Sequence, residues 1–247
     1  GCQLFDRHGG KTKLTISGLQ LLPFVEQAFQ QLELGMSSLK KVNLSNELKI
    51  SALHSVTSLV LIPKIDSFNQ NYPDIHVQFS PNNKLDDFES VDIDIAIRRG
   101  KGNYPGLESR KLIDDKIVLV ASPAIGLEKL SHLDYVKTLP ILEDTSSDIQ
   151  EAINDFSRKF KIKREELNYS LRTTDALPIV QSTLAGKGMA FVNKSLVNDM
   201  LKESTLINVL DYSFDTDRTL YLVAPQNRFS QDKIKHIEAW LREILSF

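Results

Sequence analysis

Short apolar segments alternate with helical ones from residue 48 to residue 247, and this alternation constrains the fold more than any other feature. Strand-like segments are predicted over residues 48–53, 75–80, 92–97, 116–121, 139–142, 169–172, 189–192 and 220–223. Helices are predicted between or after them, over residues 56–71, 148–160, 177–184 and 230–245. Strands separated by helices are typical of sheets that contain parallel strands. The sequence therefore predicts an α/β protein.

The chain is long enough for two such sheets. Its 247 residues exceed the roughly 100 to 200 residues at which a single domain usually stops growing. The alternation runs once before Pro123 and again after it, so Pro123 is expected to mark the crossing from a first lobe to a second. Gly186 and Gly188 follow the helix predicted over 177–184, where a glycine C-cap can lead into a tight loop.

A β-hairpin is predicted at the start of the chain. Leu4 and Ile16 bracket the sequence His8-Gly9-Gly10-Lys11, whose glycines suit a tight turn with positive φ. Thr15 or Ser17 can cap the helix that follows. The segment is too short to bury its own apolar residues, so we expect it to be the end of a larger domain.

A long amphipathic helix is predicted after the hairpin. Its apolar residues recur in steps of three and four and form a seam: Leu22, Val25, Phe29, Leu32, Met36 and Leu39. This spacing is typical of a coiled coil or helix pair, so we expect a dimerisation face. The alternative is a helix packed on its own domain. Pro23 is expected to start the helix or to kink it, and residues 42–47 are expected to be a polar linker.

Composition excludes several classes of protein. The net charge of −2 is too small for wholesale attraction to nucleic acid, and no apolar stretch approaches the roughly 18 residues of a membrane span. The first ten residues do not resemble a secretory signal, so a cytoplasmic protein without membrane contact is expected. Cys2 is the single cysteine of the sequence, which excludes an internal disulfide.

No motif for catalysis or cofactor binding is found. The sequence has no cysteine and histidine spacing that suits zinc, no phosphate-binding glycine motif and no Gly-x-Ser-x-Gly elbow. The histidines are scattered without a nucleophile and an acid at motif spacing. We therefore expect no enzyme activity, no cofactor and no metal.

Four parts of the chain resemble LysR-type transcriptional regulators. QLFDRHGGKTKLTISGLQLL is similar to the wing and the start of the linker helix in that family, on Leu4, Phe5, Arg7, Leu14, Thr15 and Gly18. LAGKGMAFV and the series Pro63, Phe68 and Tyr72-Pro73 are further landmarks. DIDIAIRRGKGNYPGLESRKL is especially similar to the branch with the glycine-cleavage and β-lactamase regulators, on Ile97, Arg98, Gly100, Pro105, Gly106 and Leu107. Asn193 departs from the family, which usually has a proline there.

The resemblance covers the chain and implies its domain organisation. It implies a two-lobed effector domain with a periplasmic-binding-protein-like fold, preceded by a wing remnant and a long linker helix. The boundaries expected are 1–16 for the remnant of a winged helix-turn-helix domain, 17–46 for the linker helix and hinge, 47–122 with 219–247 for lobe 1, and 123–218 for lobe 2. The helix-turn-helix itself is expected upstream of Gly1.

The resemblance also implies the partners. Promoter DNA, a small-molecule effector and further copies of the chain in a homodimer or homotetramer are expected, and RNA polymerase is a further candidate. Arg7, Lys11 and Lys13 are candidates for contacts to the DNA backbone, with solvated surface charge as the alternative for each.

Candidate effector contacts in lobe 1 lie beyond the ends of two predicted strands, where α/β proteins bind ligands. His54, Ser55, Val56 and Thr57 follow the first strand, and the ligand-contacting hydroxyl of the family falls at Ser55. Ser55 and Thr57 can instead cap a helix, and His54 is expected to be packed or solvated. Arg98 or Arg99 can pair with an anionic effector. An ion pair with Asp92, Asp94 or Asp144 is the alternative.

Lobe 2 supplies two similar clusters. Thr145, Ser146 and Ser147 follow one strand, while Thr173, Thr174 and Asp175 precede a helix, and each cluster resembles an N-cap as much as a ligand cradle. We take Thr145 and Thr174 as candidates for effector contact. Tyr221 is another, because a tyrosine near this position approaches the cleft in the β-lactamase-regulator branch, although core packing is its alternative role.

The sequence therefore predicts a ligand-responsive DNA-binding regulator. A solute-binding protein of a transporter is the alternative, because it shares the two-lobed cleft, but it would need a signal sequence and would have no seam helix. An enzyme on the same fold would require converging ionisable groups that the spacing does not reveal.

Overall fold

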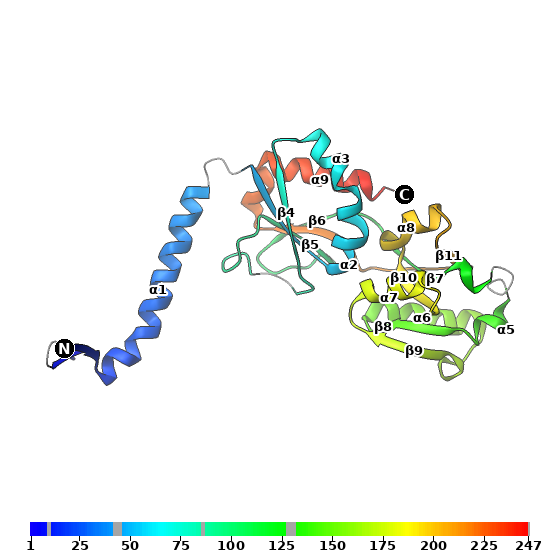
Figure 1. Cartoon of the computed structure of the whole chain (residues 1–247), viewed down its shortest axis with the longest axis horizontal. Coiled ribbons are helices and arrows are strands. Elements are labelled where there is room, and N and C mark those ends of the chain that lie inside the picture. The colour runs from blue at the N-terminus through cyan, green and yellow to red at the C-terminus, as the bar shows by residue number, and fades with distance from the viewer. Residues whose placement is uncertain (9–10, 42–45, 85–86, 127–131, 247) are drawn as a thin grey trace. The chain divides into compact units, whose positions relative to one another are not determined.

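The computed structural model describes the chain except residues 9–10, 42–45, 85–86, 127–131 and 247 (Figure 1). The chain forms two compact units, one of residues 1–45 with 89–91, and one of residues 46–88 with 92–247. In the part that is described, no helix is both long and apolar enough to span a membrane.

The first unit contains the predicted hairpin and long helix. Strands β1 (Phe5–His8) and β2 (Lys11–Leu14) pair antiparallel, and α1 spans Ile16–Lys41. The turn predicted at Gly9-Gly10 lies outside the described residues. Thr15 caps α1 as predicted, since its Oγ1 accepts the backbone N–H of Gly18 at 3.1 Å.

Gly18 is required where the hairpin meets α1. A Cβ at this position would lie 2.3 Å from the carbonyl oxygen of Leu4, so no other residue fits without displacing the backbone. Pro23 lies inside α1, so the prediction that it starts the helix was wrong. Helical hydrogen bonding begins earlier because the Thr15 cap, rather than the proline, sets the first turn.

The first sheet of the second unit has the strand order β4-β3-β5-β12-β6. Its strands are β3 (Glu47–Ala52), β4 (His76–Pro81), β5 (Ile95–Gly100), β6 (Glu108–Lys111) and β12 (Thr219–Ala224). Strand β3 runs parallel to β4 and β5, and β12 runs antiparallel to β5 and β6. The last strand of the chain, β12, therefore returns to the sheet that contains β3.

The second sheet has the order β11-β7-β10-β8-β9. Its strands are β7 (Lys116–Ala121), β8 (Pro140–Asp144), β9 (Asn168–Thr173), β10 (Met189–Asn193) and β11 (Ile207–Asp215). Strands β8, β9 and β10 are parallel, and β7 is antiparallel to β10 and β11. We call the first sheet with its helices lobe 1 and the second sheet with its helices lobe 2.

Three predicted boundaries were wrong. Strand β7 belongs to lobe 2, so the chain crosses between Lys111 and Lys116, and Pro123 begins a 3-10 turn instead. The linker predicted over 42–47 ends before Glu47, which is already in β3; residues 42–45 lie outside the described part. Strand β5 begins at Ile95 rather than Asp92.

The late start of β5 has a physical reason. Asp94 accepts the backbone N–H of Lys49 at 2.9 Å and pairs with Lys233 at 2.8 Å and Arg228 at 3.3 Å. Asp92 pairs with the Lys49 ammonium at 2.8 Å. The two carboxylates thus connect the start of β5 with the neighbouring strand β3, and Asp94 also connects it with Arg228 and Lys233 near the end of the chain, so the regular ladder of β5 starts after them.

Helices cover the sheets. A continuous helical run begins at α2 (His54–Val56), passes through a π turn (Thr57–Leu61) and a 3-10 turn (Ile62–Lys64), and ends as α3 (Ile65–Asn71). Lobe 2 contains α5 (Leu133–Val136), α6 (Ser147–Phe160), α7 (Ala176–Leu184) and α8 (Lys194–Lys202). Helix α8 and strands β6 and β11 were not predicted. Gly186 follows α7 with φ 70° and donates its N–H to the Thr183 carbonyl, which confirms the predicted glycine C-cap.

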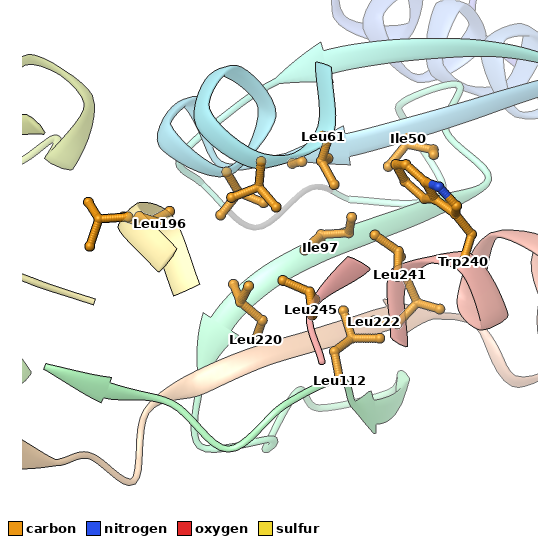
Figure 2. Close-up of a cluster of buried hydrophobic side chains, with 14 of the residues drawn as sticks. Ile50, Leu61, Ile97, Leu112, Leu196, Leu220, Leu222, Trp240, Leu241 and Leu245 are labelled. Carbon is orange, nitrogen blue, oxygen red and sulfur yellow. The ribbon is translucent and has the colours of Figure 1, made fainter. Parts of the chain in front are cut away.

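The closing helix α9 (Asp232–Ile244) packs on lobe 1 with the predicted face. Ile234, Ile237, Leu241 and Leu245 are all at most 2% exposed. Figure 2 shows Leu241 in the cluster with Ile97 and Leu222 of the sheet. Trp240 adds an edge-to-face contact with Phe68 at 5.5 Å, so α9 and α3 close the core together.

Candidate functional site

Strand β5 ends in two arginines whose side chains leave opposite faces of the sheet. Arg98 is buried, and its guanidinium donates to the carbonyl of Ile97 at 2.8 Å and to Oγ of Ser51 on β3 at 2.6 Å. Of the acids considered as alternative partners, Asp92 forms an ion pair with Lys49 and Asp94 forms one with Lys233. Arg98 is therefore held in a fixed orientation by the neighbouring strand.

Arg99 joins the two lobes. Its Nη1 donates to Asp115 Oδ2 at 2.9 Å, and its Nη2 donates to Ser195 Oγ at 3.2 Å. Ser195, at the start of α8, donates in turn to Asp115 through its hydroxyl at 2.6 Å and through its backbone N–H at 3.1 Å. Asp115 is buried at the crossing between the lobes. The sequence analysis did not identify Asp115 or Ser195. The two residues lie far apart in the sequence, and no local motif shows that they meet in the fold.

A second bridge between the lobes begins at His54. Its Nδ1 lies 3.2 Å from Asp175 Oδ2, and Asn83 Nδ2 donates to the same oxygen at 3.3 Å. Asp175 also caps α7, because its Oδ1 accepts the N–H of Leu177 at 2.9 Å. The N-cap predicted for this cluster is thus confirmed at Asp175, and His54, which was expected to be packed or solvated, is partly exposed to solvent and contacts Asp175.

The residues that follow β3 are buried. Ser55, Val56 and Thr57 are 7%, 1% and 1% exposed, and Val56 belongs to the core cluster. Leu53 is the N-cap of α2 and makes no side-chain cap, so the capping role considered for Ser55 and Thr57 was wrong. Thr57 Oγ1 is buried and has no hydrogen-bond partner within the described ranges. Such a hydroxyl costs free energy unless a ligand or water satisfies it.

The end of β8 places acidic and hydroxyl groups in lobe 2. Asp144 is buried and accepts the N–H of Ser146 at 2.8 Å. Burial raises the pKa of Asp144, the Asp148 carboxylate adds to this effect, and Arg99 of lobe 1 opposes it. The influence of Arg99 indicates that this strand end faces lobe 1.

The two threonine candidates of lobe 2 are both exposed. Thr145 donates its backbone N–H to the Thr173 carbonyl at 2.9 Å, which brings the ends of β8 and β9 together. Thr174 follows β9 directly. Asn193, at the end of β10, is buried and precedes α8 where the family usually has a proline.

Tyr221 lies among cations and a second tyrosine. On β12 it is the register partner of both Arg98 on β5 and Lys111 on β6, and its ring is half-buried. Tyr104 contacts it edge to face at 6.3 Å. Burial raises the pKa of Tyr104, while Arg98 and Arg99 act in the opposite direction. Tyr104 was also missed, since its loop carries no periodic signal.

The other predicted residues lie in the first unit. Arg7, Lys11 and Lys13 are on the paired strands β1 and β2, and the Lys13 side chain is exposed. The described seam residues Leu22, Val25, Phe29 and Leu32 are 37% to 62% exposed. Met36 and Leu39 lie on α1, but their side chains are outside the described part. Among the residues that are described, no cluster of histidine, cysteine and carboxylate side chains could hold a metal ion.

Comparisons with known proteins agree with this architecture. Residues 42–246 match the family described as LysR substrate binding domain. The chain is 24% identical over 243 residues to the glycine cleavage system transcriptional activator of Escherichia coli K12, an alignment that covers 98% of this chain and 79% of that protein.

Two solved structures share the fold. The effector domain of the transcriptional regulator AmpR of Pseudomonas aeruginosa has a TM-score of 0.65 at 18% identity, over 81% of this chain and 95% of that one. The LysR-type regulator CrgA of Neisseria meningitidis has a TM-score of 0.61 at 17% identity, over 99% of this chain and 83% of that one. These matches are to regulators, and they lend no support to the alternative of a transporter's binding protein.

Proposed function

The chain belongs to the LysR family of transcriptional regulators, and on that premise we propose that lobes 1 and 2 bind a small anionic effector between them and thereby change how the protein binds promoter DNA. The observation that carries this proposal is the Arg99 bridge. Arg99 at the end of β5 reaches Ser195 of lobe 2, so strand ends of both sheets face each other. Ligands of α/β proteins bind at such strand ends.

The effector contacts that we propose include one side chain whose orientation is set by a neighbour and one buried hydroxyl that has no hydrogen-bond partner among the described residues. Arg98 supplies a guanidinium whose orientation is set by Ser51, and Thr57 supplies a buried hydroxyl. Ser55 and Tyr221 in lobe 1 and Thr145 and Thr174 in lobe 2 complete the polar set, and Val56 contributes apolar surface. A planar guanidinium favours a carboxylate or phosphate.

Assembly and DNA contact are assigned to the first unit. We propose that residues 1–16 are the end of a winged helix-turn-helix domain and that residues 17–46 form the linker helix and hinge. In this proposal the seam of α1 pairs with a second copy in a cytoplasmic homodimer or homotetramer. Arg7, Lys11 and Lys13 contact the DNA backbone, and RNA polymerase is a further partner. The effector must bind one arrangement of this assembly better than another, typically by about 1 to 3 kcal/mol.

A binding experiment tests the effector site. A panel of small carboxylates and phosphates is screened by thermal shift on the whole chain, and the dissociation constant of any stabilising compound is measured by calorimetry. Replacing Arg98 by Gln should weaken binding about tenfold or more, because a charge-assisted hydrogen bond is lost. Ser55→Ala and Tyr221→Phe should have smaller effects. Wild-type affinity in all three variants would overturn the assignment, and Arg242→Gln on the exposed part of α9 is the control.

A further inference from the structure

The bridge at His54 differs from the Arg99 bridge because its strength depends on a proton. Both nitrogens of the His54 ring face oxygen atoms: Nδ1 lies 3.2 Å from Asp175 Oδ2, and Nε2 lies 3.2 Å from the carbonyl oxygen of Pro81. A neutral imidazole carries one N–H and one lone pair, so it can donate to only one of the two oxygens. The protonated ring donates to both.

The two oxygens belong to different lobes. Pro81 ends β4 in lobe 1, while Asp175 begins α7 in lobe 2. A neutral ring must therefore place a lone pair against either the carbonyl oxygen of its own lobe or the carboxylate of the other. Protonation removes this conflict and adds a charge-assisted contact across the lobes.

In the described part of the chain, the polar groups that face the ring come from α7 and from the loop after β4. Asp175 is the acid that faces His54 from α7, and Asn83, from the loop after β4, faces it with a neutral amide that accepts the His54 backbone N–H at 3.2 Å. In that loop Lys84 and Asp87 are exposed and of opposite charge. The His54 side chain is 45% exposed, so protons from solvent reach it.

We propose that His54, Asn83 and Asp175 form an interlobe latch that protonation of His54 closes, so that the arrangement of the two lobes responds to pH. Histidine is the side chain that changes charge between about pH 5 and pH 8. Because only the protonated ring can donate to both oxygens, we expect lower pH to favour the latch and rising pH to release it. The consequence for regulation rests on the proposed effector site, whereas the latch itself does not.

The distance between the lobes can be measured without any effector. Spin labels are attached to Asn69→Cys in lobe 1 and Ser170→Cys in lobe 2, both exposed positions, in a whole chain with Cys2→Ser. Double electron–electron resonance then gives the distance distribution at pH 5.5, 6.5 and 8.0. We expect the ratio of latched to open molecules to fall about fivefold or more from pH 5.5 to pH 8.0. Fivefold is roughly the lower end of the coupling found between linked binding sites in proteins.

Three variants identify the titrating group. His54→Gln should remove the pH dependence, because glutamine keeps a donor but does not titrate. Asp175→Asn should reduce it, since asparagine still caps α7 but carries no charge. His132→Gln, on an exposed histidine outside the latch, should behave like the wild type.

The outcomes separate the latch from the effector site. A distance distribution that stays constant with pH, or one that changes equally in His54→Gln, would overturn the latch. Because no effector is present, neither result bears on whether an effector binds. Conversely, failure of every tested anion to bind would count against the proposed effector site, while a pH-dependent distance that His54→Gln abolishes would still support the latch.

Discussion

Helices α1 and α9 present similar apolar stripes, but the described residues of the two stripes differ in burial. In α9 the residues Ile234, Ile237, Leu241 and Leu245 are at most 2% exposed, because they pack on the sheet of lobe 1. In α1 the equivalent spacing leaves Phe29 and Leu32 61% and 62% exposed. Periodicity thus identifies a helix and its apolar face, but it does not say which surface covers that face.

This difference in burial suggests that the two helices have different roles. A face buried by its own chain stabilises the lobes, whereas an exposed apolar face of this size is typical of an interface with another molecule. We infer that α1 assembles copies of the chain and that the lobes respond to small molecules. Four variants test this division, beginning with the largest expected effect.

Leu241→Ala in α9 should destabilise the second unit by about 2 to 5 kcal/mol, because it removes a buried side chain and leaves a cavity. The free energy of unfolding is measured by denaturant titration with circular dichroism. Lys235→Ala, on the exposed face of the same helix, is the matched control and should lie within about 0.5 kcal/mol of the wild type. Equal effects of the two variants would show that α9 is not packed as described.

The double variant Phe29→Glu with Leu32→Glu should leave the unfolding free energy of the lobes unchanged. It should weaken self-association by at least about 2 kcal/mol, which corresponds to a roughly 30-fold higher dissociation constant. The reason is that charges replace the apolar residues at the centre of the seam. Sedimentation equilibrium gives the constant. Glu26→Gln, on the same helix but off the seam, is the control. An unchanged constant in the double variant would refute the role of the seam.

Glu143→Gln should destabilise lobe 2 by about 1.5 to 3 kcal/mol at neutral pH, because hydrogen bonds to a buried charged group are lost. Burial opposes ionisation of Glu143, but Arg172, Gln150 and Arg164 outweigh it and hold its pKa below the ordinary value of 4.5.

The sign of the pH effect at Glu143 follows from that direction. A lowered pKa contributes stability above the ordinary range of a glutamate, and this contribution is lost as the pH falls through the pKa of the folded state. The difference in unfolding free energy between wild type and Glu143→Gln should therefore shrink below about pH 4. A difference that is constant with pH would contradict the ionised state of Glu143.

Thr15→Ala should have the smallest effect, about 0.5 to 2 kcal/mol, and only on the first turn of α1. Its hydroxyl accepts the Gly18 N–H, so its loss should speed amide exchange of Gly18. Ser17→Ala, the other residue considered as a cap, serves as the control and should change little. Faster exchange in the control alone would place the cap at Ser17.

Much of the fold followed from local patterns in the sequence. The α9 face and the Thr15 cap depend on neighbours within a few residues, and both were predicted. Strand β5 was placed three residues early, because the alternation of DIDIAI does not show that Asp94 pairs with Lys233, far along the chain. Strand β7 was placed in the wrong lobe for a similar reason, since its partners β10 and β11 come later in the sequence.

The candidate site was less predictable than the fold. Arg98 and Arg99 were singled out because they follow a predicted strand. Asp115 and Ser195 were not, because their importance arises from meeting Arg99 in space. Which residues touch an effector remains a proposal, since strand ends indicate where a ligand binds but not which side chains it contacts.

Amide hydrogen exchange of the wild-type chain at two protein concentrations tests the division between α1 and α9 most directly. If a second copy covers the seam, the amides from Leu22 to Leu32 should exchange faster on dilution, whereas those from Ile234 to Leu241 should exchange at the same rate at both concentrations. The same response in both helices would contradict the account, because α1 would then be covered, or left uncovered, independently of any other copy.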